Sequence, residues 1–120
     1  MKMPISEIID RFTITKLKSE RTTEDVQKEL DAYSSEISKY SENIKTFVDR
    51  MYEINGKIWD TEGDIRKGID MPLEEVGRLA LAVRDLNCIR NSIKAEIVEN
   101  YSEGFKEIKI NYKKIDYGRG

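Results

Sequence analysis

A heptad run of apolar residues constrains the fold of this chain more than any other feature. Apolar side chains follow one another there in alternating steps of four and three residues. The positions are Val26, Leu30, Tyr33, Ile37, Tyr40, Ile44, Phe47, Met51, Ile54, Ile58, Thr61 and Ile65. Such spacing, kept over about six repeats, is typical of a coiled-coil helix. It predicts a long helix over residues 24–68, ending at KGIDMP, and leaves open whether that helix is continuous.

Two further helices flank the long one. The first is expected to begin near Pro4, and it is apolar on two sides, as in a helix that lies between neighbours. The second runs over residues 72–101 and has its own seam at Val76, Leu79, Val83, Leu86, Ile93 and Ile97. The predicted fold class is therefore all-α: an antiparallel hairpin around the long helix plus an N-terminal helix, in a coiled-coil-like bundle. Residues 1–103 form this domain, and residues 104–120 form a short basic arm.

Unequal helix lengths predict association between copies of the chain. In an antiparallel hairpin that turns at residues 68–72, the early part of the long helix, around Tyr33 and Ile37, extends past its shorter neighbour. The N-terminal helix can cover some of this apolar stripe, and the rest favours a second helix from another molecule. We therefore expect a homodimer or a higher oligomer.

Composition excludes several classes of protein. The chain has 120 residues and a net charge of −2, so it is not a generally basic nucleic-acid coat, and no specific nucleic acid is expected as a partner. A single cysteine, Cys88, rules out an intrachain disulfide and favours an intracellular protein. Neither a membrane-length apolar run nor a signal peptide is found, so no membrane partner is expected. The predicted location is the cytoplasm of a bacterium or of a virus-infected cell.

Catalytic groups are few. The chain has no histidine and one cysteine, so the usual zinc sites and the Ser-His or Cys-His nucleophile pairs cannot be built. It also lacks a glycine-rich phosphate loop. Carboxylates with Mg²⁺ are the one remaining route to hydrolysis. EIVE (Glu96, Glu99) and EIID (Glu7, Asp10) are similar to the motifs of helical nucleotide pyrophosphohydrolases, but their order and spacing differ. We expect no enzyme activity, no catalytic or metal site and no cofactor.

Polar residues interrupt the apolar face of the third predicted helix. In RDLNCIRNSIK, Asn87, Arg90 and Lys94 fall on the same side as the apolar seam. Pairing across the predicted hairpin places Asn55 opposite Asn87, with Gly56 leaving space beside them. An unpaired cation in a dry core is very costly, so these side chains need charged partners or a polar ligand.

Two interpretations of this group stay open. In the structural one, Arg90 and Lys94 reach solvent or pair with Asp10, Glu7 or a carboxylate of a second chain, and the asparagine sets the helix register. In the functional one, the group lines a pocket for an anionic ligand. Arginine and lysine then neutralise phosphate, asparagines bind a base or ribose, and Trp59 offers a stacking surface. The candidate ligand-binding residues are Arg11, Thr15, Lys18, Asn55, Trp59, Arg84, Asn87, Arg90, Asn91 and Lys94.

Four segments carry a resemblance to known proteins. They are SEIIDRFTITKLKSER, INGKIWDTEGDIR, VRDLNCIRNSIKAEI and KINY. They resemble an uncharacterised family of short all-helical bacterial and phage proteins, some encoded near glycosyltransferases. The family's polar pattern matches here at Glu7, Asp10, Lys18, Trp59, Asp60, Glu62, Arg66, Arg84, Asn87, Arg90 and Lys94. At Arg11 the family has lysine. The resemblance implies an all-helical fold and no established activity.

In architecture and charge placement, the chain is also similar to phage proteins that sequester nucleotide signals of antiviral defence. That similarity implies a non-catalytic oligomer that captures a small phosphorylated ligand, such as a cyclic nucleotide or a cyclic ADP-ribose-type signal. The alternatives are a structural or protein-interaction coiled coil whose polar residues set the register, and a carboxylate-dependent, Mg²⁺-dependent nucleotide hydrolase.

Overall fold

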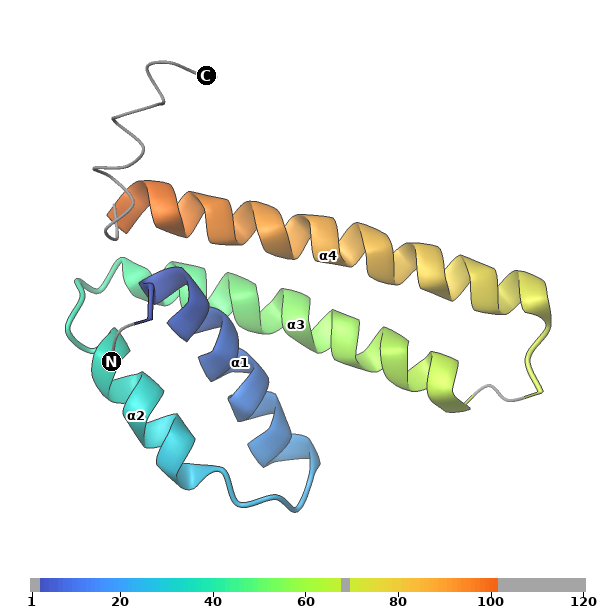
Figure 1. Ribbon diagram of the computed structural model, residues 1–120, viewed down its shortest axis with the longest axis horizontal. Coiled ribbons are helices and arrows are strands. Elements are labelled where there is room, and N and C mark those ends of the chain that lie inside the picture. The colour runs from blue at the N-terminus through green and yellow to red at the C-terminus, as the bar shows by residue number, and fades with distance from the viewer. Residues whose placement is uncertain (1–2, 68–69, 102–120) are drawn as a thin grey trace.

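The protein is a bundle of four α-helices (Figure 1). The computed structural model describes residues 3–67 and 70–101, and these residues contain no β-strand. The helices are α1 (Ile5–Arg21), α2 (Gln27–Ile37), α3 (Ile44–Lys67) and α4 (Leu73–Tyr101). The predicted all-α class is confirmed, as are the N-terminal helix and the helical hairpin. The predicted C-terminal arm, residues 104–120, lies outside the described residues.

The long helix predicted over residues 24–68 is in fact two helices, α2 and α3. Its heptad spacing continues through residues 38–43, but the backbone there does not remain helical. The amide of Tyr40 bonds the carbonyl of Ile37 at 3.1 Å, and the Ser38 hydroxyl bonds the Ser35 carbonyl at 2.7 Å. Serine side chains compete in this way with the regular helical ladder. The sequence SKYSEN thus supplies a break that the apolar spacing does not reveal.

The break lets α2 fold back along α1 (Figure 1). We expected the N-terminal helix to cover only part of the stretch around Tyr33 and Ile37, but both side chains pack against the main core of the same molecule. That expectation is wrong, because α2 is free to change direction at residues 38–43. The argument for a second copy that rested on an uncovered Tyr33 and Ile37 therefore no longer applies.

The core lies where α1 crosses the α3–α4 hairpin. It is built from isoleucines of the N-terminal helix and the apolar seams of the hairpin, with Met51 fully enclosed. Its buried members are Ile5, Ile8, Ile9, Ile44, Met51, Ile54, Ile58, Ile93 and Ile97. Tyr101 closes one end through edge-to-face contacts with Tyr40 and Phe47, at ring separations of 5.4 and 6.0 Å.

The two ends of the hairpin differ in how they are covered. The end where α3 stops and α4 begins extends past α1 and α2 (Figure 1). Between residues 73 and 92 of α4, Leu79 alone is buried, whereas Leu81 is 52% exposed and Ile89 is 50% exposed. None of the helices in the described ranges is both long and apolar enough to span a membrane.

Candidate functional site

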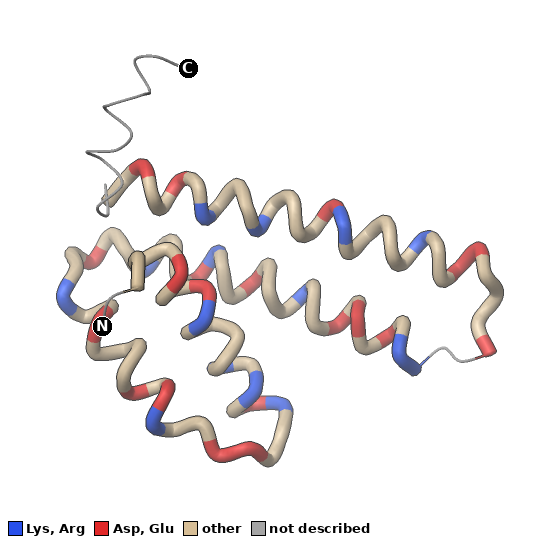
Figure 2. The backbone as a smooth tube through the Cα atoms, in the orientation of Figure 1, with Lys and Arg blue, Asp and Glu red and all other residues tan. Residues whose placement is uncertain are grey.

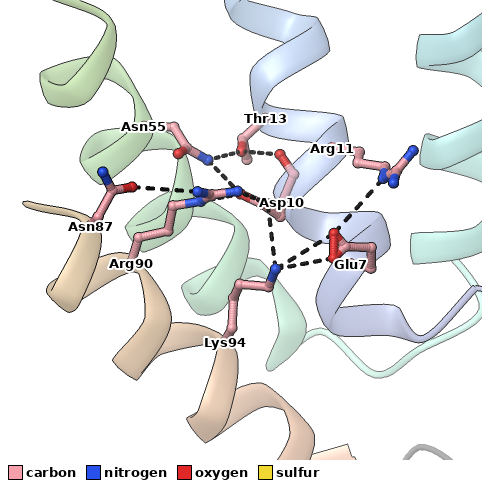
Figure 3. A network of polar contacts seen from close by, with 8 residues as sticks. All are labelled: Glu7, Asp10, Arg11, Thr13, Asn55, Asn87, Arg90 and Lys94. Carbon is pink, nitrogen blue, oxygen red and sulfur yellow. Dashed lines mark hydrogen bonds and ion pairs between the residues drawn. The ribbon is translucent and has the colours of Figure 1, made fainter. Parts of the chain in front are cut away.

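Seven polar side chains from three helices meet beside the core (Figure 3). We call them the polar cluster: Glu7, Asp10 and Thr13 of α1, Asn55 of α3, and Asn87, Arg90 and Lys94 of α4. Asp10 lies at its centre and is only 1% exposed. Arg90 binds both oxygens of this carboxylate, with Nε donating to Oδ1 at 2.9 Å and Nη2 donating to Oδ2. A two-pronged arginine–carboxylate pair of this kind fixes both distance and orientation.

Asn55 joins the long hairpin to α1. Its Nδ2 donates to Asp10 Oδ1 at 2.9 Å and to Thr13 Oγ1 at 2.9 Å. Thr13 Oγ1 in turn donates to the backbone carbonyl of Asp10 at 2.8 Å. Asp10, Thr13 and Asn55 are all nearly inaccessible to water, so these bonds replace the hydration that each group loses on burial.

Lys94 extends the cluster toward the start of α1. Its Nζ donates to Glu7 Oε2 at 3.0 Å and lies 3.6 Å from Asp10 Oδ2. Arg11 approaches Glu7 from the opposite side, at 3.8 Å, and its side chain is 55% exposed. Asn87 completes the cluster, since its Oδ1 accepts a bond from Arg90 Nη1 at 3.4 Å.

The electrostatics of the cluster favour the ionised pair. Burial by itself raises the pKa of Asp10. The hydrogen bonds from Arg90 and Asn55, with the positive charges of Arg90 and Lys94, outweigh that effect and lower the pKa below its ordinary value of 3.8. The same contact with Asp10 raises the pKa of Arg90. Carboxylate and guanidinium are therefore both charged at neutral pH.

The structure brings together four of the residues that the sequence predicts for the site: Asn55, Asn87, Arg90 and Lys94. It also shows the pairs named by the structural interpretation, Arg90 with Asp10 and Lys94 with Glu7. A phosphate at this position would have to displace both carboxylates from their cations.

The predicted contribution of α1 is wrong in its choice of face. Arg11 reaches only Glu7, at the edge of the polar cluster (Figure 3), and Thr15 and Lys18 are not among the buried residues of α1. Instead, α1 turns Asp10 and Thr13 toward the hairpin. Arg11, Thr15 and Lys18 do share one stripe by helical spacing, but the buried side of α1 is set by its isoleucines, which lie together with Asp10 and Thr13. A position on the same side as Ile9 is the signal that would have selected Thr13 as well as Asp10.

Other predicted site residues lie elsewhere. Arg84 and Asn91 are exposed on α4, and the Arg84 side chain lies 3.3 Å from that of its neighbour Asp85. Trp59 lines a separate cleft between α3 and the end of α1. Gly56 does not leave space within the cluster, because its nearest side chains are those of Leu17 and Arg21.

The carboxylates do not gather into a metal centre. Within residues 3–67 and 70–101, no group of three or more histidine, cysteine, aspartate or glutamate residues is placed to hold a metal ion. Glu96, part of the EIVE segment, pairs with Arg50 of α3 at 2.8 Å. Glu7 and Asp10 of the EIID segment are held by the cations of the polar cluster.

Comparisons of the chain with protein-family models, with curated proteins and with solved structures find no match. The resemblance to the uncharacterised all-helical family therefore stays a prediction.

Proposed function

We propose that the protein is a non-catalytic helical module that self-associates through the outer side of α4. We call this surface the outer α4 face. It consists of the exposed residues Gly77, Leu81, Arg84, Asp85, Cys88, Ser92 and Ala95. By helical geometry these residues lie opposite the buried seam of Leu79, Ile93 and Ile97. One observation carries the proposal. Besides the side that packs against α3, α4 has a second stripe of apolar and small residues, and this stripe is exposed.

The composition of the outer α4 face suits a second helix. Leu81 and Cys88 are seven residues apart, so they lie on one line along the helix. Gly77, Ser92 and Ala95 continue that line with small side chains, which allow the axes of two packed helices to approach closely. Leu81 remains 52% exposed in the single chain. Burying such a side chain against another helix is favourable by about 1.5–3 kcal/mol.

The charges beside this stripe favour a second copy of the chain whose α4 runs parallel to the first. Arg84 and Asp85 lie on either side of the line through Leu81 and Cys88, and both are largely exposed. A two-fold axis along the helices places Arg84 beside the partner's Asp85, and the reverse pair forms by symmetry. An antiparallel pair would instead place Arg84 beside the partner's Arg84. We therefore infer a parallel dimer, or a higher oligomer built on that pair.

The polar cluster supports such a module from within. It fixes how α1 lies across the hairpin, because a shift of α1 by one turn would leave Asp10 buried without Arg90 and Asn55. This is the register-setting role that buried polar groups perform in coiled coils. Figure 2 shows residues of both charge signs along every helix.

Charge exchange tests the proposal. Arg84→Glu creates like charges across the two-fold axis and is expected to weaken the dimer by about tenfold. Adding Asp85→Arg restores opposite charges and is expected to restore the association. Sedimentation equilibrium over a range of concentrations measures both effects, with Lys57→Glu on α3 as a control of equal charge change. A wild-type chain that is monomeric throughout, or a double variant no better than Arg84→Glu, would overturn the proposal.

A further inference from the structure

A cleft separate from the polar cluster lies where the last turns of α1 and α3 approach each other. It has a volume of about 470 Å³, within the range of small-molecule sites. Its lining combines one aromatic side chain, three cations, two carboxylates and a glycine: Arg21, Trp59, Asp60, Gly63, Asp64, Arg66 and Lys67. None of these residues belongs to the polar cluster or to the outer α4 face.

Two of the three cations that line the cleft differ from the cations of the polar cluster, because no carboxylate of the described residues pairs with them. Arg21 donates to Asp60, which satisfies that pair. Arg66 and Lys67, in the last turn of α3, form no ion pair with any residue in the described ranges. Arg90 and Lys94, by contrast, are each held by a carboxylate. An incoming anion can therefore bind Arg66 and Lys67 without first displacing a partner from residues 3–67 or 70–101.

The indole of Trp59 can be reached from the same side. Trp59, Gly63 and Arg66 follow one another at helical spacing and share one face of α3. A side chain at Gly63 would occupy the space beside Arg66, whose Nη2 lies 4.0 Å from an ideal Cβ position there. Glycine places no side chain of its own between the indole and the guanidinium.

We propose that this cleft binds a nucleoside monophosphate. The base stacks on Trp59, the phosphate is bound by Arg66 and Lys67, and the ribose hydroxyls donate hydrogen bonds to Asp64. The mixture of charges argues for this class. Inorganic phosphate would face two carboxylates and gain no stacking, and a free nucleoside would leave both cations without a partner. The proposal does not depend on self-association, because the two surfaces share no residue.

The chain's single tryptophan gives a direct measurement, because Trp59 is the only indole present. Titration of the full-length protein with AMP is expected to quench its fluorescence saturably, and isothermal calorimetry gives the affinity independently. Adenosine and inorganic phosphate are each expected to bind at least about tenfold more weakly, since each loses one of the two contacts.

Substitutions locate the site. Arg66→Gln is expected to weaken AMP binding by about tenfold, whereas Lys57→Gln, which removes one exposed charge elsewhere on α3, leaves it unchanged. Circular dichroism checks that both variants remain helical. A chain that gives no saturable signal with AMP, or two variants that weaken binding equally, would overturn the proposal. Equal affinity for AMP and inorganic phosphate would contradict the role of Trp59.

Discussion

The Asp10 carboxylate makes two cations acceptable beside an apolar core. It is almost wholly buried, yet it accepts bonds from Arg90 and Asn55 and lies close to Lys94. Burying a single charged group costs much free energy, but a buried ion pair is tolerated when its donors and acceptors are all hydrogen-bonded. Replacing one member is therefore more harmful than the strength of any single hydrogen bond suggests.

Arg90→Ala is expected to lower the free energy of unfolding by about 2–3 kcal/mol, because it leaves Asp10 buried without its main partner. Urea denaturation followed by circular dichroism measures this change. Lys57→Ala, which removes an exposed cation from a weak pair with Glu53, is the matched control and should change stability by less than about 0.5 kcal/mol. An Arg90→Ala chain as stable as this control would contradict the structural role of the cluster.

Acid should weaken the same contact. The folded-state pKa of Asp10 lies below its ordinary value of 3.8, so the unfolded chain takes up this proton first as the pH falls. The stabilisation by the Asp10 carboxylate is therefore complete above that value and is lost as the pH drops through the lower, folded-state pKa. Asp10→Asn lacks this ionisation. The stability difference between wild type and Asp10→Asn should be largest near neutral pH and shrink below about pH 4. A constant difference across that range would contradict this.

The sequence names six of the seven residues of this cluster, with Glu7 and Asp10 as the carboxylate partners of the structural interpretation, and misses Thr13 for a physical reason. Arg90, Lys94 and Asn87 stand out because helical spacing places them among apolar residues of their own helix. Periodicity says nothing about which side of α1 packs against them. Thr13 is recognisable as part of the site only once Ile8 and Ile9 define that side, whereas Arg11 and Lys18 lie on the other side of the helix.

At the scale of elements, the junction between α2 and α3 shows how local hydrogen bonding overrides apolar spacing. The heptad pattern runs through residues 38–43 without interruption, and Ile37 and Ile44 on either side both face the core. Short contacts by Ser38 and the amide of Tyr40 end α2 there. The start of α1 and the extent of α4 were predictable, because proline and glycine mark both.

The packing of α3 against α1 leaves room for one methyl group at Gly56. An ideal Cβ there would lie 3.8 Å from the nearest atoms of Leu17 and Arg21, an ordinary van der Waals contact. Gly56→Ala is therefore expected to raise the free energy of unfolding by about 0.5–1 kcal/mol, since alanine favours the helix. Thermal denaturation measures the gain. Gly56→Leu should lower the melting temperature because the larger side chain overfills the same contact. A loss of stability with alanine would show that the two helices pack more tightly than described.

At the scale of the whole molecule, one end of the hairpin is well covered and the other is not. α1 and α2 enclose the end that carries the core, while the far end consists of α3 and α4 alone (Figure 1). Leu73, Leu81 and Ile89 remain at least half exposed along α4. The stretch around Tyr33 is covered within the chain and so gives no reason to expect an oligomer. The exposed outer α4 face is a different reason to expect an oligomer. It becomes visible only when the position of α4 in the fold is known, and helix lengths alone do not predict it.

Cys88 tests the central claim most directly, because the proposed two-fold axis brings it next to the partner's Cys88. Mild oxidation of the wild-type chain is expected to give a disulfide-linked dimer on a non-reducing gel. A chain with Cys88→Ser and Leu81→Cys should crosslink equally well, since both positions face their own copies in a parallel pair. Cys88→Ser with Lys45→Cys, a cysteine in the first turn of α3 and outside the outer α4 face, should not crosslink. A wild-type chain that forms no more disulfide-linked dimer than this control would contradict self-association through α4.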